Sequence, residues 1–263
     1  MNADPEIWKM PPIIRTDDHR YIFDRVEYPG VTNVLKVIDK SDALISWAAT
    51  NTAQAALEML TTKPDDIEVW NPEALRTLWN SVGTDGVIKA LTSRSTWKRD
   101  EAAHLGTRVH GYADDLVNGR PIPALIGNQK AYVDRYAEWW KNAGWTIRAT
   151  EAMLIHPEHG YGGTLDILAR DRDGLTVLAD IKTGKAVYSE ATLQLTAYGD
   201  AAMIQTAAGD LYPMPKVDRY AILHVTAEPT REVPIVIGTL ERMAWLACLD
   251  LYAWHKTTKG KRL

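Results

Sequence analysis

The chain has 263 residues, enough for one large domain or for a core with an elaboration, and it can bury a sizeable core. Apolar residues make up 46% and charged residues 24%, as in an ordinary soluble globular protein, and no apolar stretch reaches membrane length. The lone Cys248 excludes an intramolecular disulfide and any multi-cysteine metal site, and the opening residues lack a signal peptide's apolar run, so we expect a cytoplasmic protein. The net charge of −4 does not exclude nucleic-acid binding, because basic patches act locally.

Residues 1–95 are predicted to form an N-terminal arm and a helical elaboration. Residues 1 to about 30 are rich in proline and charge, and we expect them to be irregular apart from a short strand around residues 21–23. Thr32 is expected to cap a helix, and the helical pattern continues to about Leu60. Further helices are expected at about residues 72–80 and 84–91, without a catalytic constellation.

Two helices are predicted to precede the main strands. The first covers about residues 97–118 and contains His110, and the second covers about residues 128–142. Trp97 is the tryptophan that we expect to touch nucleic acid, because aromatic rings stack on unpaired bases while nearby cations follow the backbone. The cations of this patch are Arg94, Lys98, Arg99 and Arg108.

Residues 145–155 alternate as a strand. Glu151 falls on its predicted apolar face, which otherwise carries Trp145, Ile147, Ala149, Met153 and Ile155. A carboxylate on an apolar face must be paired, protonated or bound to metal. An ion pair with an arginine at the strand end and a role at a metal site are both open for Glu151.

A β-hairpin is predicted over residues 161–185, and the rest of the chain is organised around it. Its strands, at about 164–170 and 175–181, flank a polar turn that ends in Gly174. A three-residue loop is the hairpin length that takes glycine in the left-handed position closing the turn, and this length fixes how the two strands pair.

The predicted pairing sets Asp166 opposite Asp180 and places Lys182 on the same face of the sheet. Two opposed acids repel each other, and a divalent cation between them removes that repulsion. A lysine beside two metal-held carboxylates completes a hydrolytic site. The alternative is a solvated face on which three charged residues fall by chance, and the glycine-closed turn and the apolar neighbours Leu165 and Ile181 favour the site.

The last part of the chain is predicted to complete an α/β fold with a mixed sheet. We expect a helix over about residues 189–208 with Gln194 and Tyr198 on one face, strands at about 220–225 and 235–237, and a closing helix at about 241–255. Histidines at zinc-site spacing, a phosphate-binding glycine loop and a nucleophile elbow are all missing from the sequence.

Five short elements stand in order across about residues 106–200: Gly106-Thr107-Arg108-Val109-His110, Glu151, Gly163-x-x-Asp166, Asp180-Ile181-Lys182-Thr183-Gly184 and Gln194-x-x-x-Tyr198. In this order they resemble the RecB-like exonuclease branch of the PD-(D/E)XK nuclease superfamily. Residues 28–32 also resemble the start of some members of that branch. The resemblance implies, for residues 96–263, a PD-(D/E)XK nuclease-like core with a mixed β-sheet flanked by helices.

The resemblance also implies a role for each matching residue. Lys182 would orient or deprotonate the attacking water, and Gln194 and Tyr198 would position the strand near the scissile bond, with Gln194 also holding Lys182. The implied metal ligands are His110, Glu151, Asp166, Asp180 and the carbonyl of Ile181, and the implied catalytic set is Asp166, Asp180, Lys182 and Glu151. Further expected substrate contacts are Arg108, Trp97 and Arg99.

The expected cofactor is Mg²⁺ or Mn²⁺. Magnesium prefers oxygen ligands, so a histidine among the carboxylates favours manganese. Some relatives hold an iron–sulfur cluster on four cysteines, and this chain, having only Cys248, is expected to hold none.

The expected function is that of a metal-dependent DNA exonuclease, acting on single-stranded or frayed ends in recombination, repair or phage replication. We expect it in a bacterial or phage-infected host cytoplasm, with DNA and a recombination or replication protein as partners and no membrane. A structure-specific or restriction-like endonuclease and a non-catalytic DNA-binding module on the same fold stay open. The intact set of Asp166, Asp180 and Lys182 argues against the last of these.

Overall fold

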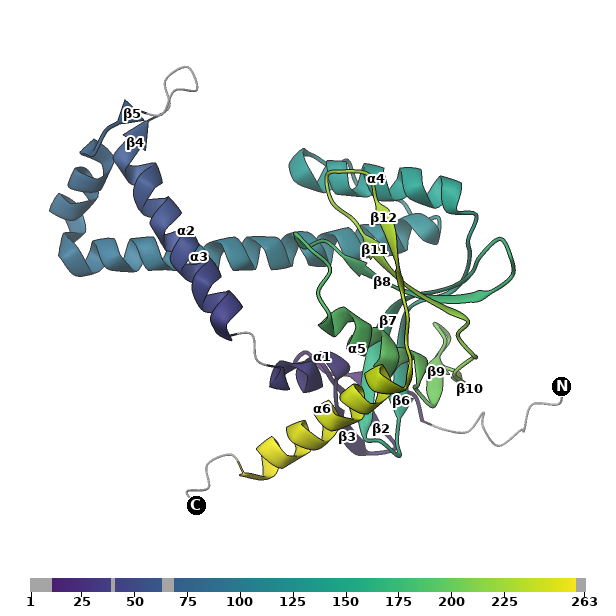
Figure 1. Ribbon diagram of the computed structural model, residues 1–263. Helices are drawn as coiled ribbons and strands as arrows, with labels where there is room; N and C mark the ends of the chain where they lie inside the picture. The colour runs from purple at the N-terminus through teal and green to yellow at the C-terminus, as the bar shows by residue number, and fades with distance from the viewer. Residues whose placement is uncertain (1–10, 39–40, 63–68, 259–263) are drawn as a thin grey trace, which may run out of the picture. The chain divides into compact units, whose positions relative to one another are not determined.

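The computed structural model describes residues 11–38, 41–62 and 69–258 (Figure 1). The chain divides into two compact units, one of residues 1–38 and 106–263, which we call the core unit, and one of residues 39–105, which we call the insertion. This division corrects the expected one, in which residues 1–95 formed a single N-terminal part. The beginning of the chain belongs with the core, and the insertion interrupts that core in sequence.

A seven-stranded mixed sheet is the centre of the core unit, which confirms the expected α/β class. The strand order is β10-β9-β6-β7-β8-β11-β12; β8 and β11 run parallel, and the other neighbouring strands run antiparallel. The strands are β6 (Thr146–His156), β7 (Tyr161–Arg170), β8 (Thr176–Lys182), β9 (Met203–Gln205), β10 (Leu211–Pro213), β11 (Arg219–His224) and β12 (Arg231–Ile235). β9 and β10 were not expected: β9 lies where the end of a longer helix was predicted, and β10 lies after the predicted end of that helix.

The hairpin of β7 and β8 has the predicted register. Ile167 pairs with Ala179, and at the turn the Asp171 amide donates to the Leu175 carbonyl at 3.0 Å. Gly174 has a φ of 79°, in the left-handed region that glycine enters without steric cost. Continuing this register by one residue sets Asp166 opposite Asp180, as the sequence predicts.

Helices cover the sheet, and both faces of its central strands are buried (Figure 1). Successive strand residues point to opposite faces, and in β7 both Leu168 and its neighbour Ala169 are buried. One apolar cluster joins α1, α5 and α6 to the sheet through Val34, Leu195 and Trp245. The helices of the core unit are α1 (Val31–Val34), the 3₁₀ helix η2 (Leu35–Val37), the last part of α3 (Glu73–Val117), α4 (Gly127–Ala143), α5 (Glu190–Gly199) and α6 (Thr239–Thr258).

The N-terminal region is more ordered than its composition indicates. It forms a three-stranded antiparallel sheet, and its side chains Tyr21 and Phe23 pack with Ile155 of β6 and Leu211 of β10. The expected cap at Thr32 is wrong, because Gly30 is the N-cap of α1 and no side chain caps it. The strands of this sheet are β1 (Ile14–Arg15), β2 (Arg20–Phe23) and β3 (Val26–Pro29).

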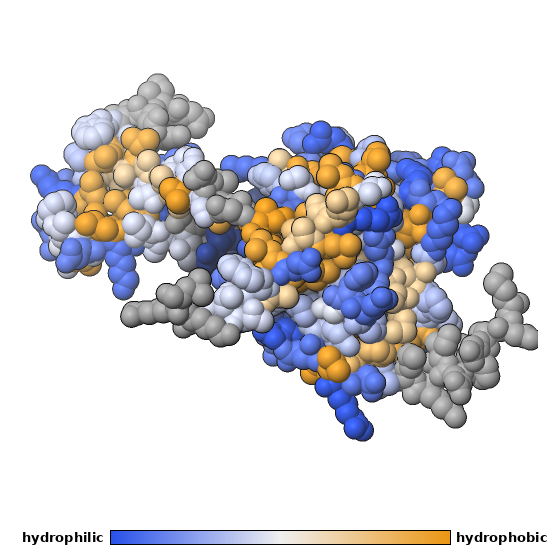
Figure 2. Space-filling view, turned by 60° about the horizontal axis from the view of Figure 1, so that its bottom comes forward, coloured by the Kyte–Doolittle hydropathy of each residue, from blue (hydrophilic) through white to orange (hydrophobic). Residues whose placement is uncertain are grey.

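The insertion consists of α2 (Ser41–Leu60), the short strands β4 (Thr61–Thr62) and β5 (Val69–Trp70), and the first part of α3. The helix expected at 72–80 is confirmed as the first segment of α3, which the non-helical Gly83, with a φ of 66°, separates from the rest of α3. The two helices expected at 84–91 and 97–118 are instead one continuous helix. Large apolar side chains lie on its surface, as the orange patches of Figure 2 show. Among the described residues, no helix combines the length and the apolar character needed to span a membrane.

Candidate active site

A pocket of about 600 Å³ in the core unit brings most of the predicted site residues together. Its walls come from the N-terminal sheet, α1, α3, β6, β7, β8 and α5. The predicted residues that line it are His110, Glu151, Asp166, Asp180, Lys182, Gln194 and Tyr198. Five elements of the sequence that are up to 88 positions apart therefore meet at one concave surface.

Three of these side chains form a compact group that is suited to a metal ion. One ligand atom each from His110, Glu151 and Asp166 lie within 4.8 Å of one another. The imidazole Nδ1 of His110 is 3.4 Å from Oδ2 of Asp166, and the Ile181 amide donates to the same oxygen at 2.7 Å. One imidazole and two carboxylates form a donor set that first-row divalent ions such as manganese accept.

Charges in this group depend strongly on one another. Burial opposes the charged form of His110, but the carboxylate of Asp166 outweighs it and raises the pKa of His110 to about 9. Burial by itself would raise the pKa of Asp166, and the charge and hydrogen bond of His110 instead lower it. Without a metal, His110 and Asp166 are therefore an ion pair, and a cation must displace the imidazolium proton.

Asp180 is a nearly fully buried acid beside this group. Its side chain is 1% exposed, and neither carboxylate oxygen has a hydrogen-bond partner among the described residues. The Lys182 ammonium lies 2.6 Å from Oδ2, without the alignment of a hydrogen bond. Burial raises the pKa of Asp180, whereas that of Lys182 is raised despite burial by the charge of Asp180.

Asp180 does not belong to the compact group of three, which differs from the expectation that Asp166 and Asp180 are the main metal ligands. Its two buried oxygens nevertheless fit a cation, because only the Lys182 ammonium offsets their charge and neither oxygen accepts a hydrogen bond from a described residue. Asp180 thus lines the pocket as a further acceptor next to His110, Glu151 and Asp166.

A chain of hydrogen bonds holds Lys182 in place, and its expected contact with Gln194 is confirmed. The ammonium donates to Gln194 Oε1 at 3.0 Å, and Gln194 Nε2 donates to the Tyr198 hydroxyl at 2.9 Å. Gly163 makes room for this chain, because a Cβ there would lie 2.6 Å from a ring carbon of Tyr198. Burial raises the pKa of Tyr198, so its hydroxyl stays protonated.

Glu151 reaches the pocket from a position in strand β6 where the backbone is left-handed. Its φ is 46°, and it stands between Thr150, which pairs with Ile167, and Ala152, which pairs with Leu165. The uniform apolar face expected for this strand is wrong, because the pairing with β7 also shifts between Ile147 and Ala149.

The side chain of Glu151 is exposed toward the pocket, and it forms no ion pair with an arginine in the described part of the chain. Partial burial of the carboxylate is the main cause that raises the pKa of Glu151 to about 7, and the negative charge of Asp166 is the second. A left-handed non-glycine residue persists only where the surroundings over-determine it, and such residues gather at functional sites.

Two residues of the pocket were missed in the sequence: Arg15 of β1 and His19 of the turn that follows. Arg15 Nη2 and His19 Nδ1 are 2.7 Å apart, and burial, followed by the charge of Arg15, lowers the pKa of His19. His19 has a φ of 59°, so it is the second left-handed non-glycine residue in this pocket. No residue pattern signals this, because nothing local in the N-terminal stretch shows that it folds back onto the core.

Arg108, Trp97 and Arg99 are not among the residues that line the pocket. Arg108 hydrogen-bonds Gln129 when the amide oxygen of Gln129 faces it, at 3.0 and 3.1 Å. In the insertion, Arg99 pairs with Asp100 at 3.0 Å, and Trp97 is 53% exposed. The expected basic patch is thus partly neutralised by its own acids and amides.

Comparison of the chain with known protein families and with curated proteins finds no match. The functional argument therefore depends on the pocket itself. Beside Arg15 and His19 it holds His110, three acids and a lysine held by a glutamine, which together form a donor set for a divalent ion beside a fixed cation.

Proposed function

We propose that this protein is a divalent-metal-dependent nuclease that hydrolyses phosphodiester bonds in DNA. The observation that carries the proposal is the meeting of His110, Glu151 and Asp166 with the buried pair Asp180 and Lys182 in one pocket. The order of the matching sequence elements, which resembles that of RecB-like nucleases, supports the same chemistry. Phosphodiester hydrolysis requires an activated water and relief of charge on phosphorus, and both fit a site of acids with one fixed cation.

His110, Glu151 and Asp166 would hold the metal, with Asp180 as a further acceptor. When bound, a divalent cation lowers the pKa of a water molecule and offsets negative charge on the phosphoryl oxygens. Mg²⁺ and Mn²⁺ are both suitable, and the imidazole of His110 favours Mn²⁺. The site has no cysteine ligands, so the proposal involves no iron–sulfur cluster.

Lys182 has the role of a phosphate-stabilising cation rather than of a base in the metal-free protein. Its pKa is raised, so its ammonium stays protonated, and Asp180 and Gln194 fix its position. Arg15 and His19 also line the pocket, where an arginine can hold a phosphate oxygen. The pocket therefore pairs acids for the metal with cations for the phosphate.

The preference for free, single-stranded ends is the finer part of the proposal. It rests on the resemblance to exonucleases and on the exposed ring of Trp97, with the guanidinium of Arg94 4.7 Å from its centroid. The corresponding roles are in DNA recombination, repair or phage replication in the cytoplasm, beside a recombination or replication protein.

The test compares a linear single strand with the same sequence closed into a circle, each with Mg²⁺, with Mn²⁺ and with chelator. Linear DNA should be degraded in a metal-dependent way, and Asp166→Asn should lower turnover about 10³-fold, which corresponds to about 4 kcal/mol. Asp134→Asn is the matched control, because Asp134 is an exposed residue of α4 and should leave turnover unchanged.

The other outcomes overturn parts of the proposal. Equal rates on the circle and the linear strand would show an endonuclease. Binding of DNA with no cleavage in either metal would show a non-catalytic binding module.

A further inference from the structure

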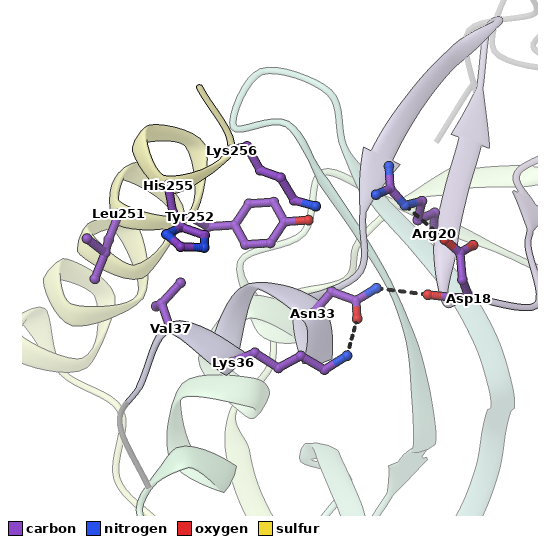
Figure 3. A pocket seen from close by; sticks show the side chains of 9 residues that line it. All are labelled: Asp18, Arg20, Asn33, Lys36, Val37, Leu251, Tyr252, His255 and Lys256. Atoms are coloured by element: carbon purple, nitrogen blue, oxygen red, sulfur yellow. Dashed lines mark hydrogen bonds and ion pairs between the residues drawn. The ribbon is translucent and has the colours of Figure 1, made fainter. Parts of the chain in front are cut away.

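A second pocket, of about 610 Å³, lies in the core unit between η2, the β1–β2 turn and the end of α6 (Figure 3). Its lining is basic: Arg20, Lys36, His255 and Lys256 line it together with Tyr252, and Asp18 is its acid. The chain as a whole has a net charge of −4, so three permanent cations against one anion make this a local positive region.

A narrow ridge separates this pocket from the candidate active site. In the β1–β2 turn, His19 lines the active-site pocket and its neighbours Asp18 and Arg20 line the second pocket. In α1, Thr32 lines the first and Asn33 the second. Neighbouring Cα atoms are about 3.8 Å apart, so the two pockets are one residue apart along both segments.

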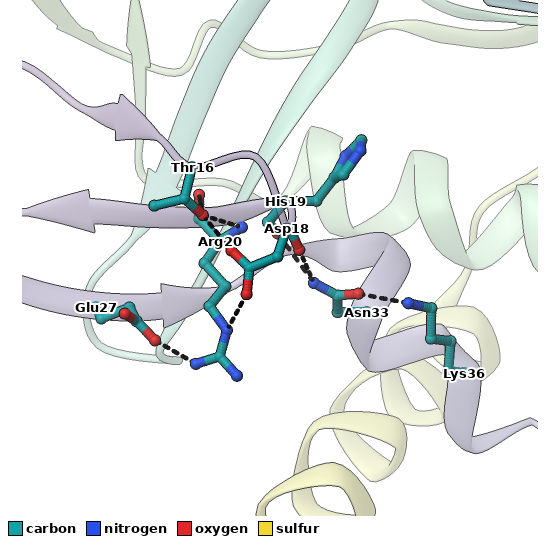
Figure 4. Close-up of polar contacts among 7 residues, drawn as sticks. All are labelled: Thr16, Asp18, His19, Arg20, Glu27, Asn33 and Lys36. Carbon is teal, nitrogen blue, oxygen red and sulfur yellow. Dashed lines mark hydrogen bonds and ion pairs between the residues drawn. The ribbon is translucent and has the colours of Figure 1, made fainter.

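The ridge is held together by hydrogen bonds (Figure 4). The Asn33 amide donates to the carbonyl oxygens of Asp18 at 2.9 Å and His19 at 3.1 Å, which joins α1 to the turn. The Thr16 hydroxyl donates to Asp18 Oδ1 at 2.6 Å. His19 points away from Arg20 in Figure 4, so the turn presents side chains to both pockets at once.

Lys36 and Lys256 are the cations that a ligand can use. Lys36 donates to Asn33 Oδ1 at 2.7 Å, and the Lys256 ammonium lies 5.4 Å from the ring centroid of Tyr252. Neither of them forms an ion pair with a carboxylate among the described residues, whereas Arg20 is already paired with Asp18 and Glu27. Lys256 lies in the last turn of α6, where a cation also offsets the helix dipole. Lys36 lies in the last turn of η2, but η2 has only three residues and its dipole is small.

We propose that the second pocket binds the backbone of single-stranded nucleic acid one or a few nucleotides away from the bond at the active site. The proposal rests on the proposed nuclease function and names where the strand continues. Two available ammonium groups and an aromatic ring are the combination that holds a phosphate and stacks a base. The ridge is narrow enough for one strand to lie across it, with a phosphate on each side.

Binding is measured by the fluorescence anisotropy of a labelled single strand of about 12 nucleotides in chelator, where no metal-dependent cleavage occurs. Lys36→Glu with Lys256→Glu should weaken binding at least about tenfold and make the slope of log K against log salt less negative by about 1.4, or about 0.7 per phosphate contact. Lys141→Glu with Lys216→Glu makes the same change in net charge at exposed positions elsewhere in the core unit and should change neither quantity. Equal effects of the two double variants would overturn the proposal.

Substitutions of Tyr252 test whether the second pocket binds a nucleic-acid strand or only a small anion. Tyr252→Ala should weaken strand binding about 5-fold or more, and Tyr252→Phe, which keeps the ring, should not. Inorganic pyrophosphate and a nucleoside monophosphate serve as competitors. If either displaces the strand at a concentration close to the strand's own Kd, the pocket is a small-anion site and the strand proposal is wrong.

The failure of this inference differs from the failure of the proposed function. In one outcome, the Lys36 and Lys256 double variant loses strand binding, but the unsubstituted protein does not cleave DNA with Mg²⁺ or with Mn²⁺. This outcome would keep the second pocket and overturn the nuclease. Asp166-dependent cleavage together with unchanged strand binding in that variant would keep the nuclease and overturn the second pocket.

Discussion

The core unit and the insertion differ most in how much apolar surface they bury. In the core unit, side chains as large as Trp245 and Leu195 are at most 1% exposed. In the insertion, the buried side chains among the described residues are Asn51, Ala55 and Val87. Its large apolar side chains are instead exposed, and they include Leu44, Ile45, Leu57, Trp70, Trp79, Val82, Ile88 and Trp97.

This difference in burial suits the core unit to holding the site and the insertion to contacting other molecules. Site geometry requires side chains that are locked by packing. Glu151 and Asp166 lie on a sheet whose central strands are buried on both faces, and His110 joins them from α3. Exposed apolar side chains of the insertion stabilise little by burial, and surfaces of this kind serve for contact with other molecules. We therefore expect substitutions in the core unit to change chemistry or stability strongly, and substitutions in the insertion to act weakly.

The largest expected effect is on the buried acid and its lysine. Asp180→Ala and Lys182→Ala should each lower turnover about 10³-fold while the protein stays folded, because they remove the acceptor and the fixed cation of the site. Asp180→Ala also leaves the Lys182 ammonium without the carboxylate that lies 2.6 Å from it, so the melting temperature of the metal-free form should fall. Single-turnover rates and calorimetric melting measure the two effects, and near-normal turnover in Asp180→Ala would contradict the assignment of the site.

A matched pair of leucines tests the packing contrast directly. Leu195→Ala empties a fully buried position of α5 and should lower the free energy of unfolding by about 2–5 kcal/mol. Leu57→Ala, at a half-exposed position of α2, should cost less than about 0.5 kcal/mol. Urea unfolding followed by circular dichroism gives both values, and similar losses would mean that the insertion has a core that its exposed side chains do not indicate.

Local signals in the sequence predicted the hairpin. The elements that were missed depend on contacts between residues that are far apart in the sequence. Gly174 and strict alternation are enough to set Asp166 opposite Asp180, because the turn fixes the register. The N-terminal sheet was predicted as an irregular arm, since its stability comes from Tyr21 packing with Ile155, which is 134 positions away. Short strands such as β9 depend in the same way on a distant partner, and their pairing with β6 has no local signal.

The candidate site shows the same division between local and non-local information. Glu151 stood out as an acid in an apolar strand, although the regular alternation assumed for that strand does not exist. Arg15 and His19 were not predicted, because the left-handed backbone at His19 follows from the fold and not from its residue type. The metal group formed by His110, Glu151 and Asp166 likewise depends on how α3 packs beside the sheet.

The pH dependence should be confined to the core unit. The pKa of Glu151 is raised from 4.5 to about 7 and that of His110 from 6.5 to about 9, so each group stabilises the metal-free fold fully below its ordinary value. That stability is lost as the pH rises through about 7 for Glu151 and about 9 for His110. Hydrogen exchange should therefore show β6 and β7 of the metal-free protein becoming less protected between pH 6 and 9, with α2 unchanged after correction for intrinsic exchange.

Metal binding should have the opposite dependence on pH. A cation needs neutral His110 and ionised Glu151, so its apparent affinity should rise up to about tenfold per pH unit between about pH 7 and 9. Calorimetric titration with Mn²⁺ measures this slope, and His110→Asn should flatten it. A slope that His110→Asn leaves intact would mean that His110 does not release a proton when the metal binds.

The smallest expected effect comes from the insertion, and it decides whether that unit takes part in binding DNA. Trp97 is half-exposed, and its cation partner Arg94 is also paired with Glu58 at 3.2 Å. Arg99 is paired with Asp100. Because the cations are already partly neutralised, Trp97 and Arg99 together should contribute only at the low end of the range for base stacking, about 1 kcal/mol. Trp97→Ala with Arg99→Ala should thus raise the KM for a linear single strand about 5- to 10-fold and leave kcat within about twofold.

Trp79→Ala with Arg76→Ala is the matched control, because it removes another exposed tryptophan and a neighbouring ion-paired arginine of the same helix. Equal changes in KM for the two double variants would show that the effect comes from lost charge and apolar surface in general. A fall in kcat without a change in KM would place Trp97 and Arg99 in the chemical step, and the division between a catalytic core unit and a contact-making insertion would then be wrong.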